Sequence, residues 1–292
     1  MKKLALSTTS VVLALVVTVV AGEAPPLTFT FSKANVPGAL QTFTGDINNC
    51  GIRVGQYQDK NSVLHGFILG KDVLITLDDP NGTNTLANGI QYNGLLVVGS
   101  YTNTSGNSVG FLYKDDKFTD ITGPDGATAS GANSINDQGA IVGYYVDSGG
   151  TQHGFLLKGS TYKTLDVPGA VATGIDAIND RGDMVVFWVD STGAGQSSIS
   201  YDGGMNYRKI NVPGAITSIA NDLNNEGDVV YEWFDSNDAV HGALLHNKQF
   251  YKYDYPKAVL TYAGGINDES TIVGGYEVKS NGPFSSYEAH FK

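Results

Sequence analysis

A repeat of 43 to 45 residues runs through the chain and constrains its fold more than any other feature. The segment INDQG at 135–139 recurs as INDRG at 178–182 and as LNNEG at 223–227. Weaker copies begin at Ile47, Ile90 and Ile266. A proline keeps the same period, at Pro37, Pro80, Pro124, Pro168, Pro213 and Pro256. Because two independent markers share one period, the sequence consists of six tandem units.

Each unit has the pattern of four short strands. In the third unit we expect strands at residues 128–135, 140–147, 153–158 and 162–167. These segments are rich in β-branched and aromatic residues, and Gly and Asx residues separate them where tight turns require positive φ. Serial four-stranded units of this length are typical of a β-propeller. The sequence therefore predicts an all-β fold, a six-bladed β-propeller with four-stranded blades.

The two ends of the repeat region complement each other. The last unit stops at residues 286–292 (SYEAHFK), which align with a third strand, so its fourth strand is missing. A surplus segment at 27–39 (LTFTFSKANVPGA) aligns with a fourth strand. We therefore expect the N-terminal strand to complete the last blade and close the ring, which removes the free sheet edges. Residues 25–292 would then form a single propeller domain.

The first 24 residues have the pattern of an export signal. Lys2 and Lys3 precede an apolar run at 11–20, and small residues follow at 21–24. We expect cleavage near Ala21–Ala24 and a secreted or periplasmic bacterial protein. Cys50 is the only cysteine, so no internal disulfide can form.

Charge excludes two classes of partner. The formal net charge is −11, and the Lys and Arg residues are scattered singly along the chain. Phosphate recognition needs clustered cations, so we expect no nucleic-acid binding. After the signal no stretch approaches the ~18 to 20 apolar residues of a membrane span, so we expect no membrane insertion. We expect a monomer.

The motifs INDxG, IVGxYxD, HGFLL and DxPGA resemble the bacterial extracellular repeats of the HAF family. The resemblance covers roughly residues 27–292. It implies a repeat fold and export but identifies no chemistry. Blades four and five depart from the pattern, because Trp188 and Trp233 replace the tyrosine of IVGxYxD.

A second period of 88 residues distinguishes odd units from even units. A histidine opens the third strand of each odd unit, and an aspartate precedes it by six residues. The pairs are Asp59 with His65, Asp147 with His153, and Asp235 with His241. Each pair could be a structural clasp across the hairpin turn or an acid–base pair beside a ligand. The three histidines are not expected to share a metal, because third strands stand far from the propeller axis.

Two further sets of side chains are candidate ligand contacts. A hydroxyl occurs at the start of every innermost strand, where it could bind a polyhydroxylated ligand or cap the backbone of the preceding turn. These residues are Thr42, Thr85, Ser130, Thr173, Ser218 and Thr261. The aromatic residue of each second strand, including Trp188 and Trp233, could pack between blades or form a sugar platform.

Acidic residues that break the repeat are the candidate catalytic groups. They are Asp46, Asp176 and Asp222 near the innermost strands, with Glu232 beside Trp233. Two carboxylates ~5 to 10 Å apart could hydrolyse glycosidic bonds. Oxygen ligands could instead hold a calcium ion, although the sequence itself predicts no metal and no cofactor.

Three functions remain open from the sequence. The leading hypothesis is a secreted, non-catalytic binding propeller for an extracellular glycan or a surface protein. The alternative is a polysaccharide hydrolase or lyase with the acids above as catalytic residues. A purely structural surface protein would self-associate and bind no small ligand.

Overall fold

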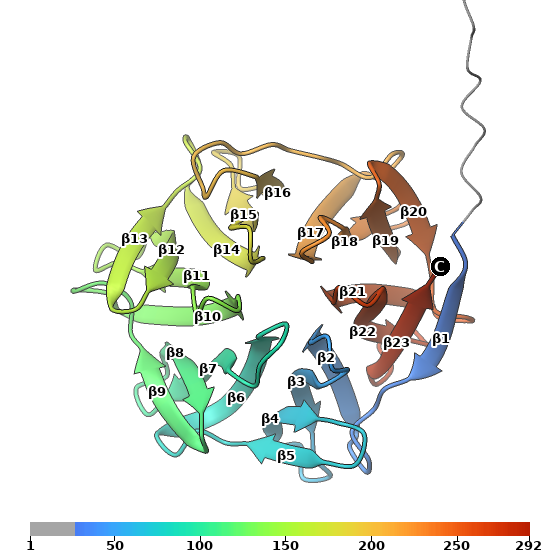
Figure 1. The fold of residues 1–292 in the computed structure, drawn as a ribbon, viewed down its shortest axis with the longest axis horizontal. Helices are drawn as coiled ribbons and strands as arrows, with labels where there is room; N and C mark the ends of the chain where they lie inside the picture. Colours follow the sequence, from blue (N-terminus) through green and yellow to red (C-terminus); the bar gives the residue numbers. More distant parts are fainter. Residues whose placement is uncertain (1–26) are drawn as a thin grey trace, which may run out of the picture.

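The computed structural model describes residues 27–292, and the predicted signal segment at 1–24 lies outside the described residues. Six antiparallel sheets are arranged around a central axis (Figure 1), which confirms the predicted six-bladed β-propeller. All regular elements of residues 27–292 are β-strands. Within these residues, no helix has the length and apolar character needed to cross a membrane.

In blades one to five the innermost strand comes first in sequence, and the following strands lie progressively further from the axis. Blade one contains β2 (Gln41–Ile47), β3 (Arg53–Gln58), β4 (Leu64–Leu69) and β5 (Leu74–Leu77). Blade two contains β6 (Gly82–Ile90), β7 (Val97–Asn103), β8 (Ser108–Lys114) and β9 (Lys117–Ile121). Blade three contains β10 (Ala129–Ile135), β11 (Ile141–Val146), β12 (Gln152–Lys158) and β13 (Thr161–Leu165).

The second half of the ring is less regular. Blade four contains β14 (Ala172–Ile178), β15 (Met184–Val189) and β16 (Gly195–Ser200). Blade five contains β17 (Thr217–Leu223), β18 (Val229–Phe234), β19 (Val240–His246) and β20 (Gln249–Tyr253). Blade six contains β21 (Leu260–Ile266), β22 (Thr271–Glu277), β23 (Ser285–Phe291) and the N-terminal strand β1 (Phe29–Lys33).

Strand β1 closes the ring as predicted. It pairs antiparallel with β23, so that Phe29 lies opposite Phe291 and Phe31 opposite Ala289. The ring of Phe31 contacts the rings of Tyr253, Tyr255 and Tyr287, at centroid distances of 5.6 to 6.2 Å. Figure 1 shows β1 outermost in blade six, beside the C-terminus.

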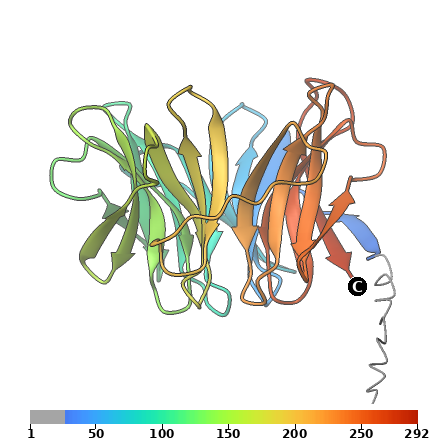
Figure 2. The ribbon, with the colours of Figure 1, turned by 90° about the horizontal axis from the view of Figure 1, so that it is seen from above.

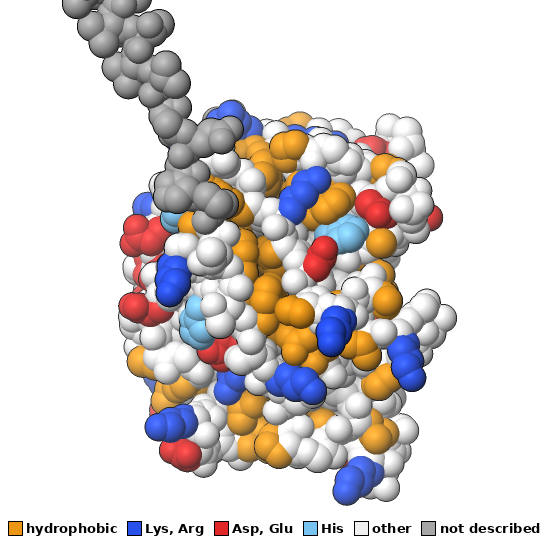
Figure 3. Space-filling model, turned by 90° about the vertical axis from the view of Figure 1, so that its right-hand side faces the viewer, with side chains coloured by type: hydrophobic (Ala, Val, Ile, Leu, Met, Phe, Trp, Pro, Cys, Tyr) orange, Lys and Arg blue, Asp and Glu red, His pale blue; other side chains and the backbone are white. Residues whose placement is uncertain are grey.

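The side of the ring that carries β1 and the C-terminus has both hydrophobic and charged side chains on its surface. Figure 3 shows hydrophobic side chains gathered on this side, with Lys, Arg, Asp and Glu side chains standing singly among them. The single cations on this side match the scattered charge that the sequence shows.

Blade four corrects the prediction of four strands in every blade. Its expected fourth strand is reduced to one bridge between Ile199 and Arg208. Gly203 and Gly204 both have positive φ, at 71° and 83°, so the chain turns away from the sheet after β16. Asp202 holds this turn, because its Oδ1 accepts backbone hydrogen bonds from Met205 and Asn206. The chain then crosses toward blade five as an irregular segment (Figure 2).

The hydrophobic core lies between neighbouring blades. One cluster joins Val98 and Ile121 of blade two to Ala132 and Ile135 of blade three. The phenylalanine of the third strand, Phe67, Phe111 or Phe155 in blades one to three, is fully buried. Burial between blades makes each interface part of the core, so the ring is stabilised as one unit.

We call the face that carries the turns between first and second strands the lower face, and the opposite one the upper face. On the lower face, side-chain amides of one turn donate to backbone oxygens of the next at 3.0 to 3.3 Å. These donors are Asn48, Gln91, Asn136, Asn179, Asn224 and Asn267. These bonds form a closed ring, which we call the amide belt, because Asn267 of blade six donates to Asn48 O of blade one. The INDxG turns therefore connect each blade to its neighbour.

Blade two has a longer lower-face turn than the others, and this turn projects toward the axis (Figure 1). Its Tyr92 is buried at 6% exposure. The Tyr92 hydroxyl donates a hydrogen bond to Leu223 O of blade five, on the opposite side of the ring. Tyr92 therefore closes the lower end of the central channel.

Candidate functional site

The central channel brings three of the four predicted acids together. Asp46, Asp176 and Asp222 line a pocket of about 40 Å³. The side chains beside them in this pocket are Asn88, Asn133, Ser134 and Asn221. Each innermost strand has a β-bulge at this level, and an extra residue in a bulge redirects the side chains around it. The bulges explain why polar residues break the strand pattern here.

Two of these acids hold neighbouring blades together. Asp46 Oδ2 accepts a hydrogen bond from Ile90 N of blade two at 2.9 Å. Asp222 Oδ2 accepts one from Ile266 N of blade six at 2.8 Å. In blade three, Ser134 Oγ takes the same place and accepts from Ile178 N at 3.3 Å. Positions 46, 134 and 222 follow the 88-residue period, so each odd blade binds the next even blade in this way.

The channel pocket does not have the dimensions of a polysaccharide site. Its volume is close to the ≈30 Å³ that a single water occupies in the liquid, which is too small for a sugar ring. Burial raises the pKa of Asp46 and of Asp176 to about 7 each, and it raises the pKa of Asp222 well above the usual range. Among residues 27–292, His, Cys, Asp and Glu form no group of three that could hold a metal ion. The channel pocket is therefore a small cluster of polar side chains in which Asp46 and Asp176 are partly protonated near neutral pH.

Replacing Asp176 by Asn should stabilise the protein at neutral pH. Within residues 27–292, Asp176 accepts a single long hydrogen bond, from Asn133 at 3.4 Å, so little compensates its buried charge. Its pKa is raised on folding, so its ionisation lowers stability progressively as pH rises from about 4 to 7. We expect Asp176→Asn to raise the free energy of unfolding at pH 8 by on the order of 1–3 kcal/mol, and to have little effect at pH 4. Urea titrations at both pH values measure this, and equal effects at the two would contradict it.

The hydroxyls at the start of the innermost strands are backbone caps in the structure. Five of the six accept a hydrogen bond from the backbone N–H six residues earlier, at 2.8 to 3.2 Å. These are Thr42, Thr85, Thr173, Ser218 and Thr261. Ser130 instead donates to Ile121 O and accepts from Gly110 N. All six are buried, so the structure favours the backbone cap, the second of the two alternatives that the sequence left open.

The histidines of the odd blades each lie between two aspartates. In blade three, His153 Nε2 lies 3.4 Å from Asp147 Oδ2, as the spacing predicts, and its Nδ1 lies 2.8 Å from Asp166 Oδ2. The same pairs occur at His65 and His241, with 3.8 and 3.6 Å to the preceding aspartate. The second aspartates, Asp78, Asp166 and Asp254, were not predicted. Their 88-residue spacing is the signal that could have identified them.

Each of these histidines also stacks on the aromatic ring of the second strand. The centroid distances are 5.1 Å for Tyr57 with His65, 5.1 Å for Tyr145 with His153, and 4.4 Å for Trp233 with His241. The first aspartate also accepts backbone hydrogen bonds inside its turn, as Asp147 does from Gly149 and Thr151. The histidines therefore clasp the hairpin, the fourth strand and the aromatic ring into one unit.

The clasp of blade three should depend on pH. The hydrogen bond to Asp166 is the main cause that raises the pKa of His153. A raised histidine pKa contributes stability that is complete below the unfolded value of ~6.5 and disappears as pH rises through the folded pKa. His153→Gln, which copies Gln196 of blade four, should therefore cost up to about 1 kcal/mol at pH 5 and less at pH 9. Chemical denaturation at both pH values tests this, and a larger loss at pH 9 would exclude a charged clasp.

A concave site on the upper face combines aromatic rings with side-chain amides. It measures about 160 Å³ and lies over blade one, with Phe284 from the loop before β23. Its lining is Gln41, Thr42, Phe43, Gln56, Tyr57, Gln58, Leu64 and Phe284. We call it the upper pocket. Its volume is below the ~300–1,000 Å³ of sites for drug-sized ligands. The pocket is therefore of a size for one ring of a longer ligand, with the amides and aromatic rings around it.

Hydrogen bonds and ring contacts preorganise the upper pocket. Gln41 Nε2 donates to Gln58 Oε1 at 3.0 Å, and Gln41 Oε1 accepts from Phe284 N at 3.3 Å. The Phe284 ring lies edge-on to Phe43 at 6.4 Å. Gly275 leaves room for Phe43, because a Cβ there would come within 2.7 Å of the ring. The side chains of Gln41, Phe43 and Phe284 are thus held in place while they remain partly exposed.

Tyr262 lies beside Phe284 at the edge of the upper pocket. Its ring contacts Phe284 at 5.3 Å, edge-on, and the charge of Glu232 contributes to raising its pKa after burial and Glu277. Burial raises the pKa of Glu232 to about 7, against a hydrogen bond from Asn221 that lowers it. Glu232 does not line the channel pocket itself, although its partner Asn221 does.

The two tryptophans pack within their blades. Trp188 Nε1 donates to Ser198 Oγ at 3.1 Å, and Trp233 Nε1 donates to Gly242 O at 3.2 Å. Lys252 Nζ lies 3.8 Å from the Trp233 ring centroid, and His241 stacks on the same ring. Both indoles are half-buried, so their placement corresponds to packing rather than to an open platform.

Comparisons with known proteins support the fold. No family model and no curated protein sequence matches the chain. Solved structures do resemble it, including AofleA from Arthrobotrys oligospora, with a TM-score of 0.53, 13% identity, and coverage of 90% of this chain and 92% of that one. Aleuria aurantia lectin in complex with α-methyl-L-fucoside gives a TM-score of 0.52 at 11% identity, with 89% and 96% coverage.

A sialidase has a similar degree of likeness. The Trypanosoma rangeli enzyme in complex with 2,3-difluorosialic acid gives a TM-score of 0.52 at 11% identity, and covers 91% of this chain and 59% of that one. At these identities the likeness concerns the fold, which lectins and hydrolases share.

Proposed function

We propose that this protein is an extracellular, non-catalytic propeller that binds glycan through the upper pocket. The observation that carries the proposal is the combination of Phe43, Phe284 and Tyr57 with the amides of Gln41, Gln56 and Gln58 in one concave site. Aromatic faces pack against the C–H faces of a sugar ring, and amides can both donate to and accept from its hydroxyls. The fold likeness to a lectin crystallised with α-methyl-L-fucoside agrees with this function.

The arrangement of the acids supports binding rather than hydrolysis. Asp46 and Asp222 are engaged by backbone N–H groups inside a channel pocket of about 40 Å³. Glu232 is the acid of the predicted set that remains outside this pocket. A pKa of about 7 would suit a general acid, so Glu232 is the residue on which a hydrolase function would depend.

A glycan array on the purified protein tests the proposal. We expect binding of a defined set of glycans, and we expect Phe284→Ala and Gln56→Ala each to weaken it about tenfold or more, which corresponds to ~1.4 kcal/mol. Phe118→Ala on β9 is the matched control, because it removes an equal, partly buried ring far from the upper pocket. An empty array, or equal losses for Phe284→Ala and Phe118→Ala, would contradict it.

The same preparation tests catalysis. Wild-type protein should release no reducing ends from the polysaccharides that it binds. Release that disappears in Glu232→Gln would replace the binding proposal with a hydrolase.

A further inference from the structure

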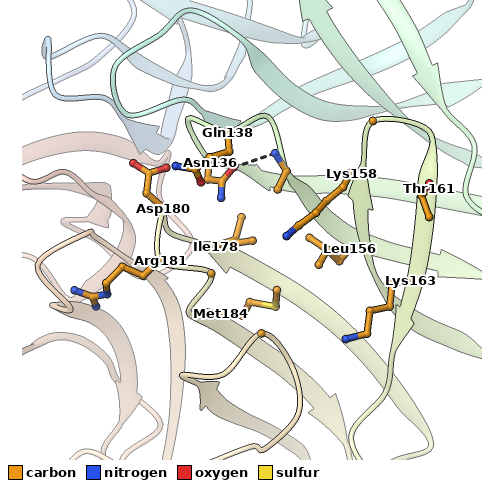
Figure 4. A pocket seen from close by; sticks show the side chains of 14 residues that line it. Asn136, Gln138, Leu156, Lys158, Thr161, Lys163, Ile178, Asp180, Arg181 and Met184 are labelled. Carbon is orange, nitrogen blue, oxygen red and sulfur yellow. Dashed lines mark hydrogen bonds between the residues drawn. The ribbon is translucent and has the colours of Figure 1, made fainter.

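A third cavity, on the lower face, lies between blades three and four and measures about 490 Å³. We call it the lower cleft. Blade three contributes the end of β12 and the start of β13, and blade four contributes the end of β14 and the turn into β15 (Figure 4). Its volume falls within the ~300–1,000 Å³ of typical ligand sites.

The floor of the lower cleft is apolar, and polar groups also line the cleft. Leu156, Ile178 and Met184 form the floor, with exposed fractions of 8%, 1% and 1%. Asn136, Gln138 and Thr161 add polar groups to the lining, and Asn136 is itself buried. Asn136 is fixed there, because its Oδ1 accepts from Ala140 N at 2.9 Å and its Nδ2 donates to Asn179 O.

Two lysines give the lower cleft a positive charge. Lys158 and Lys163 are exposed, and Figure 4 shows both side chains extending over the apolar floor. Among the described residues, neither forms an ion pair. This charge is unusual in a chain with a net charge of −11.

The other charged groups of the lower cleft are already engaged. Arg181 points away from the floor (Figure 4) and binds Asp183 Oδ2 through Nη2 at 2.7 Å. Asp180 Oδ1 accepts from Asp137 N at 2.8 Å, and its Oδ2 accepts from Asn225 Nδ2 at 3.1 Å. The two lysines are therefore the charges that remain available to a ligand.

The irregular fourth segment of blade four accounts for the position of the cleft. Gly203, in the turn that replaces the start of a fourth strand, is part of the cleft wall. A different cavity, of about 460 Å³, lies on the other side of blade four, against blade five. The blade that lost its outer strand is thus flanked by open clefts on both sides.

We propose that the lower cleft binds a short anionic oligosaccharide whose carboxylates, as in uronic acids, pair with Lys158 and Lys163. Sugar rings present apolar C–H faces to a floor such as Leu156, Ile178 and Met184, and hydroxyls to amides such as Gln138. Carboxylates on successive rings match two separate ammonium groups, which act as point charges without a fixed fork geometry. This site is independent of the upper pocket and its glycan.

Isothermal titration with oligogalacturonate tests the proposal on the full mature protein. We expect wild-type binding that weakens as salt rises from 50 to 300 mM, because exposed charges are screened beyond about 10 Å at 0.1 M. Lys158→Gln and Lys163→Gln should each weaken binding about tenfold. Lys114→Gln with Lys117→Gln is the matched control, because it removes two exposed lysines from the equivalent turn of blade two.

Four outcomes separate the possibilities. Loss of oligogalacturonate binding in the Lys158 and Lys163 variants, with the Lys114/Lys117 control intact, supports the lower cleft. If the Lys114/Lys117 control loses binding equally, the loss is explained by the change in net charge, and the proposal is overturned. Equally tight binding of a poly-glutamate peptide overturns the sugar class. Phe284→Ala should leave oligogalacturonate binding unchanged, so failure of the upper pocket and failure of the lower cleft are measured separately.

Discussion

Deletion of residues 27–33 should destabilise the whole domain rather than remove a dispensable end. The deletion removes β1, exposes the edge of β23 and uncovers Tyr253, Tyr287 and Phe291. Leu27, Phe29 and Phe31 are partly buried against this cluster, so the loss is on the order of 5 kcal/mol, comparable with the ~5–15 kcal/mol stability of a typical domain. Trp188, two blades away, should report unfolding at a much lower denaturant concentration.

Two point variants and one peptide sharpen the closure experiment. Phe31→Ala should lower stability markedly, whereas Thr30→Ala, on the exposed side of the same strand, should change it little. A peptide of residues 27–39 added to the deleted protein should restore part of the lost stability, because it can pair with β23 again. An unchanged unfolding midpoint after the deletion would show that β1 does not close the ring.

Replacing Tyr92 should have the second largest effect. Tyr92→Ala removes a buried ring from the lower end of the channel and leaves a cavity, with an expected cost of ~3–5 kcal/mol. Tyr92→Phe keeps the ring but leaves Leu223 O without its donor, so we expect a cost of ~1–3 kcal/mol. Urea unfolding of the three proteins measures both. A Tyr92→Ala protein as stable as wild type would mean that the amide belt alone connects the blades on the lower face.

The six-bladed architecture could be predicted because the sequence repeat reflects it directly. Each blade buries the same strand positions against its neighbours, so one period recurs in the sequence six times, and the surplus at 27–39 matches the strand missing after Phe291. The predicted strands of blade three agree with β10 to β13 within two residues at each end. Blade four departs from the prediction because two consecutive glycines with positive φ redirect the chain, which strand propensity does not reveal.

The candidate site was less predictable because it depends on contacts between distant segments. The channel acids were singled out because they break the repeat, and they do meet in the channel, yet their backbone partners in the next blade could not be inferred. Phe43 and Phe284 meet across the closure of the ring, 241 positions apart in the sequence. Tyr92 lies in the weak INDxG copy that begins at Ile90, and the sequence does not reveal that its hydroxyl reaches Leu223 O in blade five.

One measurement tests the central claim most directly. A glycan selected on the array is titrated into ¹⁵N-labelled protein, and the perturbed amide and side-chain NH₂ signals are mapped. The proposal predicts saturable shifts at Phe43, Gln56, Gln58 and Phe284, with the channel signals of Asn88 and Asn133 unmoved. Shifts centred on the channel, or none at glycan concentrations that saturate the array, would contradict glycan binding at the upper pocket.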